Sequence, residues 1–313
     1  MSSTRVVIAL GGNAMTAPGG SARPDDQRSA LTAAMEHVAD LIADGTEVVL
    51  THGNGPQVGN LLVKNELSAE VVPPVTLDWC GAQTQATIGF TIANALEPAL
   101  ARRGRVRAVS AVVTRTLVDA ADPAFDHPAK PVGRYLPAAE AARFRALGQD
   151  WADFGERGWR RLVASPQPAE ILDAPAVRAL LESGVVPVAA GGGGVPVVRG
   201  ADGALHGVQA VLDKDRTAAL LARALAADLL LIATDVPGAV LGYGTADACL
   251  IGRITAAQLR GHLAGGHFAE GTMGPKVEAA VRFVEAGGLR AVITGLDGVA
   301  DGLAGRSGTV VDP

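Results

Sequence analysis

The sequence predicts an α/β protein with a mainly parallel sheet covered by helices on both faces. Apolar runs of strand length alternate with segments of helical period over most of the 313 residues, which is typical of such folds. Three of these strand runs, at 5–10, 47–52 and 185–190, lead directly into glycine turns. We expect the ends of these strands to converge on one anion.

The first half of this pattern extends from residue 5 to residue 117. A strand at 5–10 precedes a helix at 25–43, whose apolar residues share one face and which ends at Asp44-Gly45. A strand at 47–52 precedes a helix at about 56–67 that starts behind Gly55. The segment 77–103 predicts a long helix, broken or bent at Pro98, and 107–117 predicts a strand.

The alternation resumes after residue 175. Helices are expected at 176–183, 213–226 and 272–286, because each has apolar residues at helical spacing. Short apolar runs predict strands at 185–190, 229–234, 291–294 and 308–311, and a hairpin at 195–207.

Residues 118–175 differ in composition from the rest of the chain. They contain two of the three tryptophans, Trp151 and Trp159, and a cluster of prolines. We interpret about 119–166 as a protruding subdomain or lid, inserted at the sheet edge of a single domain spanning 1–313. The lid then belongs to an N-terminal lobe, 1–175, and a C-terminal lobe follows at 176–313.

Composition excludes several classes of function. A net charge of −5 and only 4% aromatic residues argue against general binding to nucleic acid or to an anionic membrane. Two cysteines, Cys80 and Cys249, build neither a disulfide framework nor a cysteine zinc site, and no metal site is predicted. The start resembles no signal peptide, and the most apolar stretch, 224–241, is interrupted by charges and a proline. A cytoplasmic protein is expected.

The glycine turns indicate where a phosphate would bind. Gly11-Gly12-Asn13, Gly53-Asn54-Gly55 and Gly191 to Gly194 each follow an apolar run, and backbone amides in such turns form a donor cradle for phosphate. A missing Cβ also lets the backbone approach a ligand closely. One turn alone is equally typical of an ordinary tight connection, but three together favour a phosphate site. Neither a P-loop nor a dinucleotide fingerprint is present.

Two lysines stand at helix starts, where the helix dipole disfavours a cation. Lys214 lies between Asp213 and Asp215, and Lys276 follows Met273-Gly274-Pro275. An aspartate there is also an ordinary N-cap, and a lone lysine is usually a solvated surface residue. Together they suggest two cations meeting a polyphosphate, because phosphoryl transfer needs alignment and charge neutralisation rather than covalent help.

No side chain stands in the setting of an activated nucleophile. The chain has no Gly-x-Ser-x-Gly elbow. His52, beside Gly53, is the only suggestive histidine, and we interpret it first as a packing residue at a strand end.

Several segments resemble carbamate kinase, in the family's order from Val6 to Val310. The string at 51–60, Thr-His-Gly-Asn-Gly-Pro-Gln-Val-Gly-Asn, is the most specific. The likeness to the wider amino-acid-kinase fold is weaker. The other matching segments are 9–14, 78–85, 191–197, 213–215, 234–236 and 273–278.

The resemblance implies a three-layer α/β/α sandwich and a homodimer. It also implies the reversible reaction of ATP with carbamate to give ADP and carbamoyl phosphate, with Mg²⁺ carried by the nucleotide, as a step of arginine metabolism. The N-terminal lobe would hold carbamate and the C-terminal lobe Mg-ATP. No general base is needed, because the carboxylate of carbamate is already ionised at neutral pH.

The resemblance also assigns roles to residues. Lys214 and Lys276 would neutralise the transferring phosphoryl group, Asp215 would hold both, and Lys130 matches the lid lysine that reaches carbamate and phosphate. The residues that would face carbamate and the transferring group are Gly11, Gly12, Asn13, Gly53 and Asn54. Those expected at the nucleotide are Asp213, Thr234, Asp235, Tyr243, Met273 and Gly274.

Three departures from the family bear on nucleotide preference and lid closure. Gln209 replaces a usual glutamate, which removes a negative charge expected near Lys214. The loop after Asp235 lacks the family's Asn-Phe-Gly-Lys-Pro string, and Tyr243 is the candidate for its missing aromatic residue. Arg134-Tyr135 stands where the lid has Pro-Phe-Tyr. Two alternatives therefore stay open: a kinase of the same fold for another small carboxylate or phosphate, and a nucleotide-binding sensor without turnover.

Overall fold

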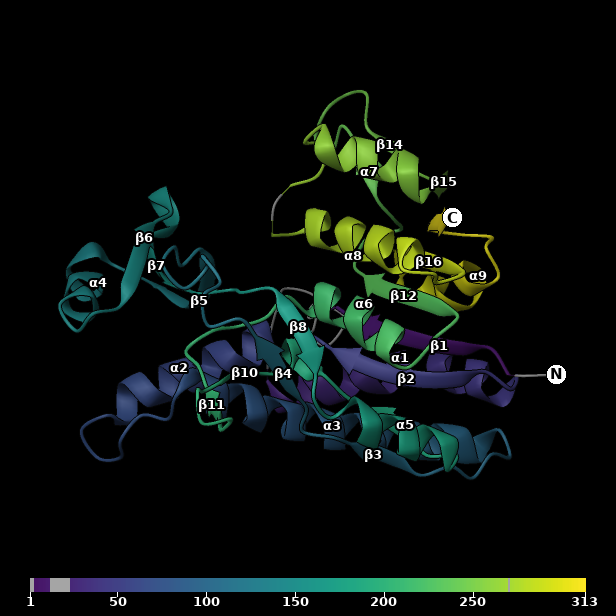
Figure 1. Ribbon diagram of the computed structural model, residues 1–313, viewed down its shortest axis with the longest axis horizontal. Helices are drawn as coiled ribbons and strands as arrows, with labels where there is room; N and C mark the ends of the chain where they lie inside the picture. The colour runs from purple at the N-terminus through teal and green to yellow at the C-terminus, as the bar shows by residue number, and fades with distance from the viewer. Residues whose placement is uncertain (1–2, 12–22, 270) are drawn as a thin grey trace.

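An eight-stranded sheet organises the computed structural model, which describes residues 3–11, 23–269 and 271–313 (Figure 1). The strand order is β15-β17-β16-β12-β1-β2-β9-β3, and all neighbours are parallel except β16 and β17. The strands are β1 (Arg5–Leu10), β2 (Glu47–His52), β3 (Val109–Ala111), β9 (Val186–Val188), β12 (Leu229–Thr234), β15 (Arg253–Thr255), β16 (Arg290–Gly295) and β17 (Thr309–Asp312).

Helices cover both faces of this sheet. Successive side chains of a strand point to opposite faces, so Val7 and Ala9 pack in one buried cluster and Val6 and Ile8 in another. The first cluster includes residues of α5 (Ala174–Glu182), α6 (Lys214–Ala224), α7 (Ala256–Ala264) and α8 (Met273–Glu285). The second includes residues of α1 (Pro24–Ala43), α3 (Leu77–Arg102) and α9 (Val299–Leu303). The predicted three-layer sandwich is therefore confirmed.

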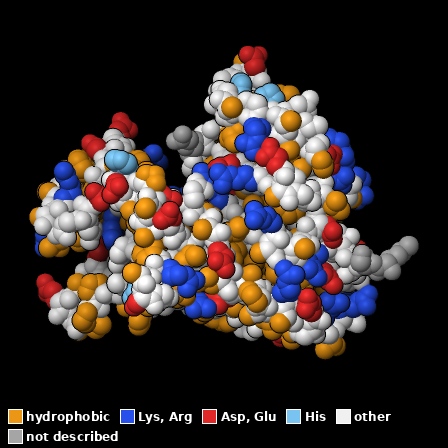
Figure 2. All heavy atoms as spheres, viewed as in Figure 1, with side chains coloured by type: hydrophobic (Ala, Val, Ile, Leu, Met, Phe, Trp, Pro, Cys, Tyr) orange, Lys and Arg blue, Asp and Glu red, His pale blue; other side chains and the backbone are white. Residues whose placement is uncertain are grey.

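A subdomain stands out from the body at the left of Figure 1. Its sheet has the order β5-β7-β6, and a recess separates it from the upper part of the body in Figure 2. It has its own small core, in which Leu136 and Trp151 are buried and Trp159 packs beside them. The clustered tryptophans thus serve this core, and the predicted protrusion is confirmed. Its elements are β5 (Lys130–Leu136), α4 (Ala138–Arg145), β6 (Asp150–Asp153), a 3₁₀ turn at Gly155–Arg157 and β7 (Trp159–Val163).

Smaller elements complete the chain. A second sheet has the order β11-β10-β4-β8, and β13 pairs with β14. No helix among the described residues is both long and apolar enough to cross a membrane. The remaining bounds are α2 (Gly55–Ser68), β4 (Arg115–Val118), β8 (Pro168–Ile171), β10 (Val195–Arg199), β11 (Leu205–Gly207), β13 (Val240–Leu241), β14 (Cys249–Leu250), and 3₁₀ turns at Gly191–Gly193 and Leu296–Gly298.

The single strand expected at 107–117 is wrong. The chain instead forms β3 in the large sheet and β4 in the smaller one. The corner between them is held by Gln85, whose Oε1 accepts from the Thr114 amide at 2.8 Å and whose Nε2 donates to the Thr114 carbonyl at 3.2 Å. This buried side chain takes over the main-chain bonds that a continuous strand would have made.

Helix α3 is not broken at Pro98. It runs without interruption to Arg102, and Leu96, Ala99 and Leu100 around the proline are fully buried in the core. Their burial holds the helix together although the proline removes one helical hydrogen bond.

Candidate active site

Four parallel strands end side by side at one edge of the large sheet. They are β12, β1, β2 and β9, in that order. Gly11 and Gly53 directly follow β1 and β2, and the glycine run from Gly191 begins three residues after the end of β9, so the three turns meet as expected. In open α/β sheets such an edge is the usual place for a ligand.

The amides of Gly11 and Gly53 do not form a phosphate cradle. The Gly11 N–H donates to the Ala233 carbonyl at 2.9 Å, and the Gly53 N–H donates to the Leu10 carbonyl at 3.0 Å. Both amides therefore extend the sheet, which corrects the expectation that they would be free for an anion. Gly12 and Asn13 lie outside the described residues.

The four-glycine run makes room for the protein's own side chains. A Cβ on Gly191, Gly192 or Gly194 would collide with the side chain of His52, Asn54 or Thr116, respectively. Gly192 also has φ +65°, a conformation that favours glycine. The expectation that these Cβ positions belong to a ligand is therefore wrong.

His52 and Asn54 hold this turn in place. The buried His52 ring has Nδ1 at 2.8 Å from the Gly53 carbonyl. Burial lowers the pKa of His52 to about 4; the Gly53 hydrogen bond opposes this shift, and the nearby Lys214 charge adds a smaller lowering. The ring is neutral at physiological pH, which supports the packing interpretation. Asn54 Nδ2 donates to Thr84 Oγ1 at 2.9 Å.

Asp213 fixes the start of α6. Its Oδ1 accepts from the amides of Asp215 and Arg216 at 3.0 and 3.2 Å, a standard N-cap. Its Oδ2 lies 3.3 Å from Nζ of Lys130, at the root of the subdomain. Asp213 contacts the start of α6 and Lys130, and it is not among the residues that line the cavity beside Lys214.

Two lysines that are 62 positions apart share the Asp215 carboxylate. Lys214 Nζ lies 2.5 Å from Oδ1, and Lys276 Nζ lies 3.0 Å from Oδ2. The chain has four lysines, and three of them contact Asp213 or Asp215. The predicted convergence of Lys214 and Lys276 is therefore present in the structure.

The charges of this cluster act on one another strongly. Burial raises the pKa of the Asp215 carboxyl, but the two ammonium groups outweigh burial and hold it below its ordinary value. Burial lowers the pKa of Lys214, and Lys276 lowers it further, against the opposing pull of Asp215. One carboxylate thus balances two cations, which leaves an excess of positive charge for an anionic ligand.

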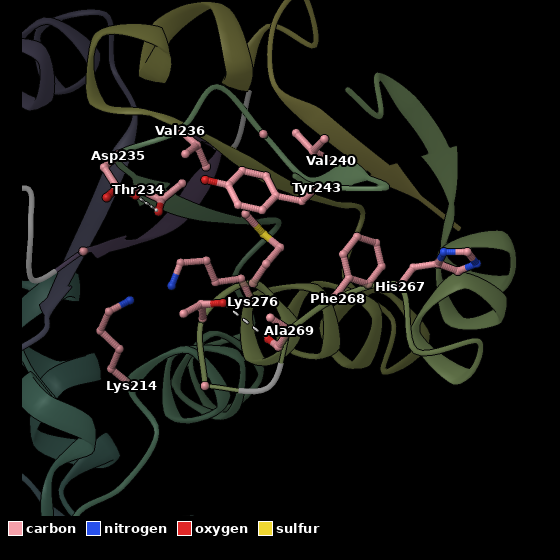
Figure 3. A pocket seen from close by; sticks show the side chains of 15 residues that line it. Lys214, Thr234, Asp235, Val236, Val240, Tyr243, His267, Phe268, Ala269 and Lys276 are labelled. Carbon is pink, nitrogen blue, oxygen red and sulfur yellow. Dashed lines mark hydrogen bonds between the residues drawn. The ribbon is translucent and has the colours of Figure 1, made fainter. Parts of the chain in front are cut away.

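A cavity of about 410 Å³ opens beside the two lysines. In Figure 3 the ammonium groups of Lys214 and Lys276 extend into the same space, near Thr234 and Asp235, and Tyr243 and Phe268 lie further along. One end is therefore cationic and the other aromatic. Its lining residues are Gly11, Lys214, Thr234, Asp235, Val236, Gly238, Val240, Tyr243, His267, Phe268, Ala269, Gly271, Thr272, Met273 and Lys276.

Most of the residues expected at a nucleotide line this cavity. They are Thr234, Asp235, Tyr243 and Met273. Gly274 instead lies buried in the first turn of α8, where its amide donates to the Ala269 carbonyl at 3.1 Å.

Residues 267–269 form a wall of the cavity that the sequence did not predict. These residues follow α7, which was not predicted. Its start carries a capping box, in which Thr255 accepts from the Gln258 amide and Gln258 reaches back to the Thr255 amide. The pattern Thr-x-x-Gln before Leu259 was the available signal.

The side chain of Gln209 contacts the first residue of α3. Its Oε1 accepts from the Leu77 amide at 3.3 Å, at the first residue of the helix. Gln209 therefore acts as a neutral cap here, and the change that it makes to the field near Lys214 stays a prediction.

Among the described residues, no group of three or more His, Cys, Asp or Glu side chains is placed to hold a metal ion. Both oxygens of Asp215 are taken by lysines.

The fold and this site define a kinase class. Residues 4–295 match the model of the amino acid kinase family, and the chain belongs to that family.

Within the family the chain falls among the carbamate kinases. It is 45% identical to the carbamate kinase of Thermococcus kodakarensis over 313 residues, which covers 98% of each chain. It is 42% identical to the carbamate kinase of Pyrococcus horikoshii over 99% of each. The structure of Giardia lamblia carbamate kinase bound to AMP-PNP matches with a TM-score of 0.94 and 37% identity, over 99% of each chain.

Proposed function

We propose that this protein transfers a phosphoryl group reversibly between ATP and carbamate, forming ADP and carbamoyl phosphate. The observation that carries the proposal is the shared contact of Lys214 and Lys276 with Asp215 beside the cavity that both lysines line. Relatives of closely similar length are named carbamate kinases.

The cavity suits a nucleotide in both size and chemistry. Its cationic end would take the phosphates, and its aromatic end, with Tyr243 and Phe268, would take the base. Tyr243 is 80% exposed, so it is free to close over a bound base. A relative with 37% identity has been crystallised with the ATP analogue AMP-PNP.

Charge neutralisation supplies the chemistry. As the phosphoryl group moves, Lys214 and Lys276 would bind its equatorial oxygens and stabilise the negative charge in the transition state. Thr234 and Asp235, across the cavity, are the candidates for orienting the metal-nucleotide complex. Mg²⁺ bound to the nucleotide would neutralise the β- and γ-phosphate charge.

The reaction needs no proton acceptor, because carbamate is already an anion. His52 is consistent with this, because its pKa of about 4 makes the ring a weak base and its side chain is buried. Gly11, with Gly53 and Asn54 nearby, would form the floor on which carbamate rests. Gly12 and Asn13 retain their predicted role.

The direct test is ATP formation from ADP and carbamoyl phosphate with Mg²⁺. We expect ATP well above the blank without enzyme. ATP formed only with another acyl phosphate would favour a same-fold kinase for a different acceptor. Tight ATP binding with no transfer in either direction would favour the sensor.

Replacing Lys130 with alanine tests the lid assignment. We expect kcat/KM for carbamoyl phosphate to fall by about 10- to 100-fold, the worth of a charge-assisted hydrogen bond. KM for ADP should change by less than about 2-fold, because Lys130 does not line the nucleotide cavity. Steady-state kinetics measure both, and Lys64→Ala, at an exposed lysine of α2, is the control. A loss confined to ADP affinity would show that the lid role is misplaced.

We further propose that the protein is a homodimer joined through the outer face of α3. Trp79 and Phe90 lie on this helix, three turns apart on one side, and are 62% and 57% exposed. Large apolar side chains aligned in this way usually mark an interface. Light scattering should give twice 31.7 kDa, and Phe90→Glu should give the monomer mass; a monomeric wild type would contradict the dimer.

The cytoplasmic location and the place in arginine metabolism stay predictions.

A further inference from the structure

Helices α6 and α8 begin side by side with charges that repel each other. Lys214 is the first residue of α6 and Lys276 the fourth of α8, and the positive end of each helix dipole lies at the same place. Leu221 of α6 and Val281 of α8 belong to the same buried cluster. When no anion is bound, the repulsion between the first turns must be balanced by another interaction, because Asp215 supplies only one negative charge.

A second ion pair joins the same two turns. Arg216 follows Asp215, and Glu278 lies two residues after Lys276. The Arg216 guanidinium donates from Nε at 2.9 Å and from Nη2 at 2.7 Å to Oε2 of Glu278. The two side chains are 26% and 19% exposed, so water screens them less than a surface pair.

The Glu278 carboxylate is fixed from its other side as well. Arg282, one turn further along α8, has Nη2 at 2.6 Å from Oε1. Glu278 does not line the cavity, so it can influence the reaction only through its neighbours. The cluster then consists of three carboxylates, on Asp213, Asp215 and Glu278, and five basic groups, on Lys130, Lys214, Arg216, Lys276 and Arg282.

We propose that Glu278 is a positioning residue, which through Arg216 holds α6 and α8 at the spacing where Lys214 and Lys276 bind one phosphoryl group. This inference rests on the proposed function. Loss of one carboxylate from the cluster leaves like charges unopposed at the two helix starts, and the first turns separate. The lysines remain present, but they no longer match a single anion.

Glu278→Gln keeps the side-chain shape and removes the charge. We expect kcat for ATP formation to fall by about 10- to 100-fold, because a displacement of about 1 Å can cost that much. KM for ADP should stay within about 2-fold, since an interaction made only in the transition state is lost. A purely structural defect would lower the melting temperature without this division between kcat and KM.

Glu285→Gln is the matched control. Glu285 lies on the same helix and also binds an arginine of another helix, Arg260, but near the far end of α8. Its variant should keep wild-type kinetics. Arg216→Gln removes the Arg216–Glu278 ion pair from the α6 side. The double variant with Glu278→Gln should lower kcat little more than either change alone. Arg216→Gln alone is the test variant if Glu278→Gln fails to fold.

Wild-type turnover is measured first, so that failure of the proposed function is recognised separately. Hydrogen exchange then reports, without relying on activity, whether the Arg216–Glu278 ion pair holds the first turns of α6 and α8 together. Glu278→Gln should speed exchange in the first turns of α6 and α8, whereas Glu285→Gln should not. Lower kcat at constant KM, with faster exchange there, supports the proposal. Wild-type kcat, a parallel rise in KM, or unchanged exchange overturns it.

Discussion

Replacing Lys276 or Lys214 with alanine is expected to lower kcat for ATP formation by about 100- to 1,000-fold, the usual cost of one transition-state donor. Both ammonium groups contact Asp215 and reach into the same cavity. Loss of either leaves the moving phosphoryl group under-neutralised at the moment of greatest charge. Because the two act as a unit, the double variant should be little worse than the poorer single variant.

The fourth lysine of the chain provides a matched control for these variants. Lys64 is exposed on α2, and Lys64→Ala should keep wild-type kinetics. Thermal unfolding of each variant shows whether the fold is intact. Near-wild-type kcat in both Lys214→Ala and Lys276→Ala, with the fold preserved, would refute the assignment.

Replacing Asp215 with asparagine is expected to damage both activity and stability. The change leaves two ammonium groups, each with a side chain only 15% exposed, without their carboxylate. Removing one member of such a buried cluster costs about 3 kcal/mol. Urea unfolding at pH 7 measures the loss, and the kinetic assay should show a fall in kcat comparable to that of the lysine variants.

The pH dependence of this loss follows from the sign of the pKa shift. The pKa of Asp215 lies below its ordinary value of 3.8 in the folded protein. Its stabilising contribution is therefore complete above that value and is lost as the pH falls through the folded pKa. Wild type and Asp215→Asn should differ most near neutral pH and converge in acid. A difference that grows below pH 4 would contradict this view of the cluster.

The Asp215→Asn change should also alter how the reaction rate depends on pH on the alkaline side. Burial and Lys276 lower the pKa of Lys214, and Asp215 counteracts them. Without the carboxylate the pKa of Lys214 falls further, so Lys214 loses its proton at lower pH. The alkaline limb of the rate profile of Asp215→Asn should move toward neutral pH. An unmoved limb would mean that Lys214 does not titrate in the reaction.

The central layer of the fold could be predicted because its strands carry their own signals. β1, β2, β12 and β16 are apolar runs of strand length, as buried parallel strands usually are. The break between β3 and β4 could not be predicted, because no glycine or proline separates them. It depends on Gln85, from a helix 29 residues away, binding the Thr114 main chain.

The site was predictable only where a residue type opposes its local setting. Lysines at the starts of α6 and α8 stood out because the helix dipole disfavours them there. The glycine run was equally visible, but sequence could not show what fills the space beside it. His52, Asn54 and Thr116 occupy the space that was assigned to a ligand. Phe268 and Ala269 gave no signal of their own, because only the placement of α7 brings them to the cavity.

A crystal structure of the protein with ADP, Mg²⁺ and aluminium fluoride, a mimic of the transferring group, would show directly whether the two lysines bind one phosphoryl group. We expect the fluoride to lie within hydrogen-bonding distance of Nζ of both Lys214 and Lys276, with the base between Tyr243 and Phe268. A mimic bound elsewhere, with both lysines still contacting only Asp215, would show that Lys214 and Lys276 do not bind the transferring group.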